Sequence, residues 1–239
     1  MFLTGSLSGT YAERALCRAS QARSLPESLT FEEGAAIFVP FYSAFQALIH
    51  RGDAKAGETV LVHGGSGGVG VPTIQLALLR GMTVIATAGT EEGLGLLRRL
   101  GVHLALNHRD ADYLDQLRAF VAPKRGVDVI IEMLANVNLA NDVQILNARG
   151  RVVVVGSRGK VEIDARHLMT VSADVRGMQL YGATEQEFET MHREIGELLA
   201  AGSIKPIVGK RFTLSEAPLA HDYIINPPSG ATGKVVLIP

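Results

Sequence analysis

Residues 63–70 read HGGSGGVG, and this stretch decides the fold class. An apolar run at 59–62 precedes it, and an apolar helical pattern over 69–80 follows it. A strand, a glycine-rich turn and a helix in that order are typical of a dinucleotide-binding unit. Glycines let the backbone approach a pyrophosphate, and the N-terminus of the helix attracts its negative charge. The flanking strand and helix supply the context that a glycine-rich turn alone lacks.

The same alternation of strand and helix patterns continues toward the C-terminus. Short apolar segments are predicted strands, at 59–64, 83–88, 103–107, 127–133, 150–156 and 175–181. Helical patterns fill the intervals, at 69–80, 91–100, 111–122, 138–147 and 164–172. Strands that are apolar on both faces and separated by helices predict a parallel sheet covered on each side. The predicted fold class is α/β, with a doubly wound parallel Rossmann sheet.

Both ends of the chain depart from this alternation. Residues 10–18 are predicted to form one isolated strand. Thr30 and Glu33 predict a capping box that opens a short helix, and an apolar helix is expected over 40–51. The C-terminal end is predicted to hold a helix, a strand, a helix and a strand, at 185–201, 207–214, 215–224 and 234–238. We interpret these pieces as a second, β-rich unit that both chain ends build together.

The composition narrows the classes of function. The 239 residues carry a formal net charge of −1, so no basic excess favours nucleic acid or an anionic membrane surface. The single cysteine, Cys17, precludes an internal disulfide and a multi-cysteine zinc site, and the seven histidines are scattered along the sequence. We therefore predict no metal, a reducing and hence cytoplasmic location, and no membrane span, because no apolar run reaches about 18 residues.

Several motifs together carry a resemblance to a known family. They are the glycine loop, AGTEEG at 88–93, NHR at 107–109, IEMLANVN at 131–138, VGSRG at 155–159 and SGATGK at 229–234. On these residues, from about Gly9 to the C-terminus, the chain resembles the zeta-crystallin type of NADPH:quinone oxidoreductase. This type belongs to the medium-chain dehydrogenase/reductase superfamily and needs no zinc. The resemblance implies a Rossmann domain beside a GroES-like β-domain, with NADPH in the cleft between them.

The resemblance also implies a division of the chain. Residues 1–45 would be a remnant of the GroES-like substrate domain, 46–184 the NADPH-binding Rossmann domain, and 185–239 a return to the GroES-like domain. Most of the N-terminal GroES-like domain, with a tyrosine that approaches the nicotinamide, would then be absent. We therefore assign no catalytic residue from the sequence, and whether turnover survives is left open.

The pyrophosphate and adenosine ends of the cofactor have separate candidate residues. Backbone N–H groups of four loop residues are expected to bind the pyrophosphate: Ser66, Gly67, Gly68 and Val69. The alternative is an ordinary helix N-terminal turn. No carboxylate stands at 88–90, where NAD-binding units place one on the ribose 2′-OH, and Glu91 and Glu92 are expected to open the next helix instead. This favours NADPH. The resemblance adds Gly89 and His108, with a solvated loop histidine as the alternative role for His108.

The resemblance implies further contacts toward the nicotinamide. They are Asn138 after the 127–133 strand, Val155, Gly156, Ser157 and Arg158 at the end of the 150–156 strand, and Met178, Gln179 and Leu180 on the last strand. A helix N-cap is the alternative role for Asn138, a surface position for Arg158, and core packing for Met178 and Leu180. Asn136 is the less favoured of the two asparagines.

The leading hypothesis is an NADPH-dependent quinone oxidoreductase that acts as a homo-oligomer, with 175–183 extending the sheet across a two-fold axis. The lack of an evident acid–base dyad suits quinones, which accept an electron or a hydride readily. One alternative is a non-enzymatic NADPH-binding protein that binds AU-rich RNA or has a structural role; the net charge speaks against RNA. Another is a related alkenal or enone reductase.

Overall fold

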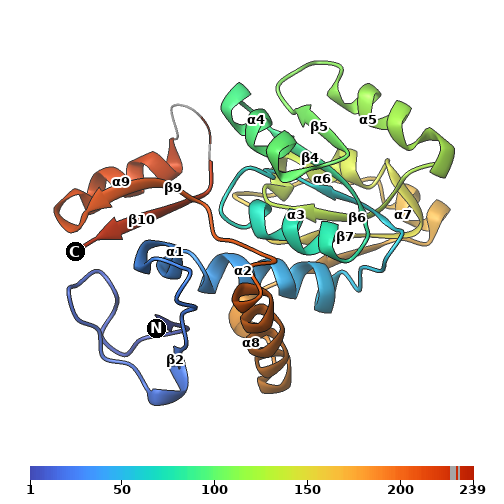
Figure 1. Ribbon diagram of the computed structural model, residues 1–239. Helices are drawn as coiled ribbons and strands as arrows, with labels where there is room; N and C mark the ends of the chain where they lie inside the picture. The colour runs from blue at the N-terminus through green and yellow to red at the C-terminus, as the bar shows by residue number, and fades with distance from the viewer. Residues whose placement is uncertain (227–229, 231) are drawn as a thin grey trace.

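The computed structural model describes residues 1–226, 230 and 232–239. A six-stranded parallel sheet forms its centre, in the order β5-β4-β3-β6-β7-β8 (Figure 1). The strands are β3 (Thr59–Val62), β4 (Thr83–Ala88), β5 (Leu104–Asn107), β6 (Val127–Glu132), β7 (Leu146–Val154) and β8 (Asp174–Gly177). The order reverses between β3 and β6, and open α/β sheets bind ligands at the carboxyl ends of the strands at such a point. The predicted doubly wound fold is confirmed.

Helices cover both faces of the sheet because its strands are apolar on both sides. Val60 and Val62 of β3 pack into one core with α3 (Gly70–Leu79) and α4 (Glu91–Leu100). Leu61 points to the other face and into a second core. That core contains residues of α5 (Tyr113–Val121), α6 (Ala135–Asp142) and α7 (Ala165–Val171). The alternation along β3 thus fixes which helix lies on which face.

A buried helix fastens the N-terminal part of the chain to the first of these cores. α1 (Phe31–Ala35) begins with the predicted capping box: Glu33 N donates to Thr30 Oγ1 at 3.2 Å, and Thr30 N donates to the Glu33 carboxylate at 2.8 Å. α2 (Phe38–Phe45) follows and continues into the π-helical turn η2 (Gln46–Arg51). Phe41, Tyr42 and Phe45 are almost wholly buried here. α8 (Glu185–Ala200) packs on the same core.

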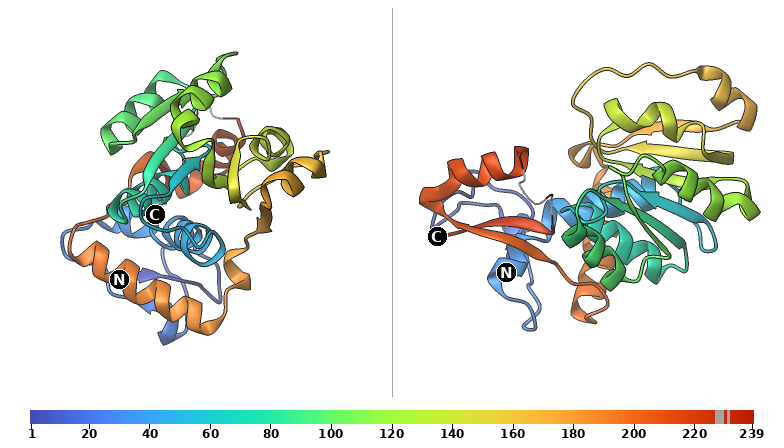
Figure 2. Two further views of the ribbon diagram at one scale, coloured as in Figure 1. Left: turned by 90° about the vertical axis from the view of Figure 1, so that its right-hand side faces the viewer. Right: turned by 90° about the horizontal axis from the view of Figure 1, so that it is seen from above.

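The two chain ends form small sheets beside the Rossmann unit. β1 (Phe2–Leu3) pairs antiparallel with β2 (Ala22–Arg23), and β9 (Val208–Thr213) pairs parallel with β10 (Lys234–Ile238), with α9 (Ala217–Ile225) between them. We call β1, β2, β9, α9 and β10 the terminal lobe; both termini lie in it (Figure 1, Figure 2). A hydrogen bond of 3.1 Å between Tyr11 Oη and His221 Nε2 joins its two halves.

Short 3-10 turns complete the described elements, at η1 (Ala19–Gln21), η3 (Ala122–Lys124), η4 (Leu180–Gly182) and η5 (Leu214–Glu216). Among the described residues, no helix has the length and the apolar character that crossing a membrane requires.

Three predicted elements are wrong, each because tertiary contacts override a local pattern. Residues 10–18 form no strand: the chain folds back on itself, and Leu7 N donates to Leu16 O at 2.7 Å. The helix predicted over 138–147 lies at Ala135–Asp142, because Ile145 O accepts a hydrogen bond from Val127 N at 2.9 Å and the chain joins the sheet. The last strand of the sheet ends at Gly177, so 178–180 follow it, and Leu180 turns inward to the core.

The outer strand β8 generates the first prediction. It pairs with β7 and forms one edge of the six-stranded sheet, and such an edge presents N–H and C=O groups to a further strand. We expect two copies to pair through β8 across a two-fold axis. Light scattering at micromolar concentration should then give the mass of a dimer that dissociates on dilution. A monomeric mass throughout would contradict this arrangement.

Candidate functional site

The glycine loop joins the carboxyl end of β3 to the N-terminus of α3. A Cβ on Gly65 would lie 2.8 Å from Ala86 Cβ, and a Cβ on Gly70 would overlap Gly64 O. Gly67 N donates to Gly64 O at 3.0 Å and closes the turn. Glycine is therefore required at 65 and 70 for the close approach of strand and helix, as in dinucleotide-binding loops.

The same loop presents backbone donors at its outer side. Among the described residues, the N–H groups of Gly68 and Val69 make no hydrogen bond. A Cβ on Gly68 would lie 3.5 Å from Lys234 Cδ and 3.9 Å from Gly233 O, so Lys234 lies beside the loop at this position. Unpaired N–H groups at the positive end of a helix dipole fit a pyrophosphate. Ser66 differs from its neighbours, because its carbonyl oxygen accepts a hydrogen bond from Gly233 N at 2.7 Å.

The second part of the candidate site lies at the carboxyl ends of β4 and β5. We call the region along the carboxyl ends of the sheet strands, beside the glycine loop, the crevice. A Cβ on Gly89 would lie 2.7 Å from His108 Nε2 and 3.0 Å from Arg109 Nε, so both side chains lie directly against Gly89. Burial lowers the pKa of His108, and the nearby His63 and Arg109 lower it further. Thr90 caps α4, which begins at Glu91 as the sequence predicts. The structure thus brings Gly89 and His108 together and adds a cation, Arg109.

The ends of β6 and β7 form the third part. Val155 N and Gly156 N donate to Glu132 O at 2.8 and 3.3 Å, which ties the two strand ends together. Asn138 donates from Nδ2 to Glu132 Oε1 at 3.1 Å. Asn138 is not a helix N-cap, because α6 begins at Ala135.

The segment 155–158 is held in place by an asparagine. Arg158 N donates to Asn136 Oδ1 at 2.8 Å, and Ser157 Oγ donates to Gly159 O at 3.0 Å. Asn136 therefore supports the loop, while Arg158 is exposed, as in the surface alternative.

Residues 178–180 lie next to this loop, since Met178 N donates to Val154 O at 3.0 Å. Leu180 is only 6% exposed and packs in the core with α2 and α8, as Met178 does in part. Both residues therefore pack in the core. Gln179 comes directly before the turn η4.

Known proteins resemble this chain in sequence and in fold. The family model described as zinc-binding dehydrogenase matches residues 68–197. Quinone oxidoreductase from Homo sapiens is 44% identical over 238 residues, which cover all of this chain and 72% of that protein; the Sus scrofa enzyme gives the same figures.

The chain belongs to the zinc-binding dehydrogenase family, in its quinone oxidoreductase branch. Among solved structures, the quinone oxidoreductase from Thermus thermophilus, studied also in complex with NADPH, superimposes with a TM-score of 0.85 at 29% identity. The match covers 97% of this chain and 74% of that one. The resemblance inferred from the sequence motifs is thereby confirmed, except that Ser229 and Ala231 of the SGATGK motif lie outside the described residues.

Two cations beside the crevice were missed by the sequence analysis. Arg109 directly follows His108, a predicted cofactor contact, in the NHR motif. This neighbouring position could have indicated Arg109 as a second contact. Lys234 comes from the far end of the chain, and only the fold brings it to the glycine loop.

A buried polar cluster underlies the crevice. His63, Glu132 and Asp142 lie at the ends of β3, β6 and α6, and each is at most 3% exposed. His63 Nε2 lies 2.9 Å from Asp142 Oδ1 and 3.5 Å from Glu132 Oε2. Glu132 also accepts hydrogen bonds from Leu134 N and Asn138. These three side chains are of types that bind metals. Their positions are far apart in the sequence, so the sequence did not indicate that they meet. In the structure His63 pairs with both carboxylates.

The charged groups of this cluster shift one another's pKa values. Burial raises the pKa of Glu132 to about 7; His63 counteracts this, and Asp142 adds to it. Burial lowers the pKa of His63, but Asp142 and Glu132 outweigh burial, so the pKa of His63 is raised. Among the described residues, Glu132 Oε2 and Asp142 Oδ2 accept no hydrogen bond.

This cluster gives a pH prediction. Both pKa values are raised by folding, so the folded protein binds more protons than the unfolded chain between pH 4.5 and the raised values. The free energy of unfolding should therefore fall as pH rises from about 5 through about 7. Glu132→Gln should flatten this slope, because the amide cannot titrate. Denaturant unfolding at several pH values measures the slope.

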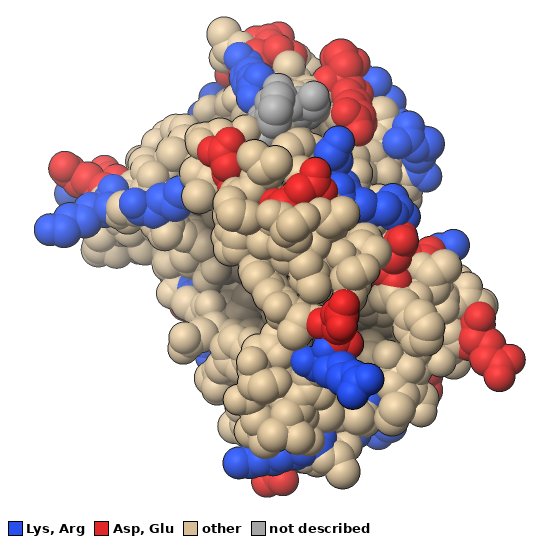
Figure 3. All heavy atoms as spheres, turned by 90° about the vertical axis from the view of Figure 1, so that its left-hand side faces the viewer, with Lys and Arg blue, Asp and Glu red and all other residues tan. Residues whose placement is uncertain are grey.

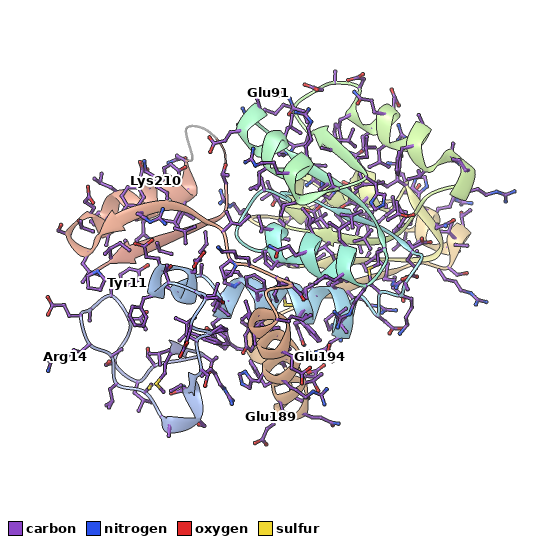
Figure 4. The ribbon with its side chains drawn as sticks, in the orientation of Figure 1. Tyr11, Arg14, Glu91, Glu189, Glu194 and Lys210 are labelled. Atoms are coloured by element: carbon purple, nitrogen blue, oxygen red, sulfur yellow. The ribbon has the colours of Figure 1, made fainter. Side chains whose placement is uncertain are left out.

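The matched control is Glu91→Gln, at the start of α4 (Figure 4), where the carboxylate is 82% exposed. This variant should keep the slope of the unaltered chain. An equal slope in Glu132→Gln would remove Glu132 as its source.

Proposed function

We propose that this chain binds NADPH in the crevice along the glycine loop and passes reducing equivalents from it to quinones. The observation that carries the proposal is the pair of unpaired N–H groups of Gly68 and Val69 at the N-terminus of α3, where the strand order of the sheet reverses. The 44% identity to quinone oxidoreductases supports the choice of acceptor. When bound, NADPH supplies the hydride or electrons, and the chain supplies binding and orientation.

The adenosine end supports NADPH over NADH. Residues 88–90 offer no carboxylate to a ribose 2′-OH, and His108 and Arg109 lie against Gly89 instead. A guanidinium suits the doubly charged 2′-phosphate, since charge-assisted hydrogen bonds to phosphate are stronger than neutral ones. His108, with its lowered pKa, offers a neutral ring N–H at pH 7.

The nicotinamide end is proposed to lie along the ends of β6, β7 and β8. The Glu132 carboxylate accepts a hydrogen bond from the Asn138 amide nitrogen, so the amide oxygen of Asn138 remains as an acceptor for the cofactor. The full proposed set of cofactor contacts is Ser66, Gly67, Gly68, Val69, Gly89, His108, Asn138, Val155, Gly156, Ser157, Arg158, Met178, Gln179 and Leu180. We also propose the division into a Rossmann domain at 46–184 with flanking segments 1–45 and 185–239.

Surface charge favours a small molecule over RNA as ligand. Figure 3 shows Lys and Arg side chains interspersed with Asp and Glu on the face it presents, without a continuous basic stripe. With a net charge of −1, the electrostatic attraction on which non-specific RNA binding depends is weak. The free Cys17 is in keeping with a cytoplasmic location, which we include in the proposal.

Cofactor titration tests this function. NADPH fluorescence should change on binding, NADH should bind about tenfold more weakly for want of the 2′-phosphate contacts, and added 9,10-phenanthrenequinone should be reduced. Gly68→Asp should weaken NADPH binding about a hundredfold, because the new carboxylate, beside Lys234 and the loop N–H groups, repels the pyrophosphate. The protein should still fold, since the nearest atom to a Cβ at this position is 3.5 Å away.

Gly196→Asp, on α8 where a Cβ meets no atom within 4 Å, is the control and should bind NADPH as the unaltered chain does. Equal affinity in Gly68→Asp, or displacement of NADPH by a uridine-rich oligonucleotide at a comparable concentration, would count against the proposal.

A further inference from the structure

Gly233 and Lys234, at the start of β10, lie against the glycine loop although they are far from it in the sequence. Gly233 forms a parallel bridge with Gly67 and donates from its N–H to Ser66 O at 2.7 Å. Gly233 has a φ of +65°, and a Cβ there would lie 2.5 Å from Ile207 O. Only glycine meets both conditions, so this contact fixes where the next residue, Lys234, projects.

Lys234 covers the open side of the loop. Its Cδ lies 3.5 Å from the position of a Cβ on Gly68, and the residue is partly buried. In the part of the chain that the structure describes, its ammonium makes no hydrogen bond or ion pair. Burial alone lowers the pKa of Lys234, without any contribution from a neighbouring carboxylate.

This placement is unfavourable for the protein by itself. A cation removed from water without a counter-ion costs free energy, and the nearby N-terminus of α3 adds positive partial charge. The unpaired N–H groups of Gly68 and Val69 belong to the same loop that the Lys234 side chain lies against. A cation without a counter-ion beside two backbone donors without an acceptor fits an anionic ligand.

We propose that Lys234 is a binding residue for the pyrophosphate of the dinucleotide. This rests on the proposed function and adds to it a contact from the terminal lobe. The pyrophosphate would give the Lys234 ammonium a counter-ion and the loop N–H groups a hydrogen-bond acceptor. Cofactor binding thereby strengthens the attachment of β10 to the glycine loop, so the terminal lobe closes one side of the site.

The pyrophosphate, rather than the 2′-phosphate, is the group within reach. Lys234 lies over Gly68 at the end of β3, whereas the groups suited to the 2′-phosphate surround Gly89 at the end of β4. Because NADPH and NADH share the pyrophosphate, a contact to it contributes equally to both affinities.

Lys234→Gln tests the assignment in the full chain. The Kd values of NADPH and NADH should both rise about tenfold, the size expected for one charge-assisted hydrogen bond. Lys210→Gln removes an exposed lysine from the paired strand β9 (Figure 4) and should leave both Kd values unchanged. Unchanged Kd values in Lys234→Gln, or a rise for NADPH alone, would overturn the proposal.

Thermal unfolding separates binding from a structural role. Without cofactor, the Lys234→Gln variant should have the same melting temperature as the unaltered chain or a higher one, because an unpaired charge is removed. The rise in melting temperature that NADPH causes should be smaller in this variant than in the unaltered chain. If the melting temperature and the affinity both fall, Lys234→Arg decides: recovery of affinity supports the phosphate contact, and no recovery overturns it. A chain that in unaltered form binds neither cofactor would overturn the proposed function and this contact together.

Discussion

The close approach of β3 and α3 at the glycine loop is the constraint on which the rest of the structure depends. Gly65 and Gly70 leave no room for a side chain, so the helix begins directly above the strand. The N-terminus of α3 therefore lies at the carboxyl end of β3, where the strand order reverses, and the N–H groups of Gly68 and Val69 stay unpaired among the described residues. In the same loop, Ser66 O accepts the hydrogen bond from Gly233 N. The close packing of β3 and α3, the proposed phosphate site and the attachment of the terminal lobe therefore all depend on this loop.

The sequence predicted the Rossmann unit well because its signals are local. The apolar runs and the glycine-rich turn act within a few residues, as does the predicted cap Thr30 of the preceding helix α1. Where pairing is non-local the prediction failed. Residues 10–18 have strand composition but no neighbouring strand, and Leu146 continues a helical pattern yet joins the sheet.

The site was predictable in part for the same reason. Residues 66–69 are recognisable from glycines beside a strand and a helix. His63, Glu132 and Asp142 are far apart in the sequence, and no spacing indicates that they meet beneath the crevice. Lys234 stands more than 160 residues from Gly68, and its role depends on a parallel bridge that only the folded chain reveals. The unpaired donors of the loop and the buried Glu132 carboxyl group both cost stability, which proteins tolerate where a ligand is bound.

The structure of the full chain with NADPH bound tests the central claim most directly. We expect pyrophosphate oxygens within hydrogen-bond distance of the N–H groups of Gly68 and Val69, with the adenosine toward Gly89 and His108 and the nicotinamide toward Asn138. A cofactor bound elsewhere, or with its pyrophosphate away from the N-terminus of α3, would contradict this claim.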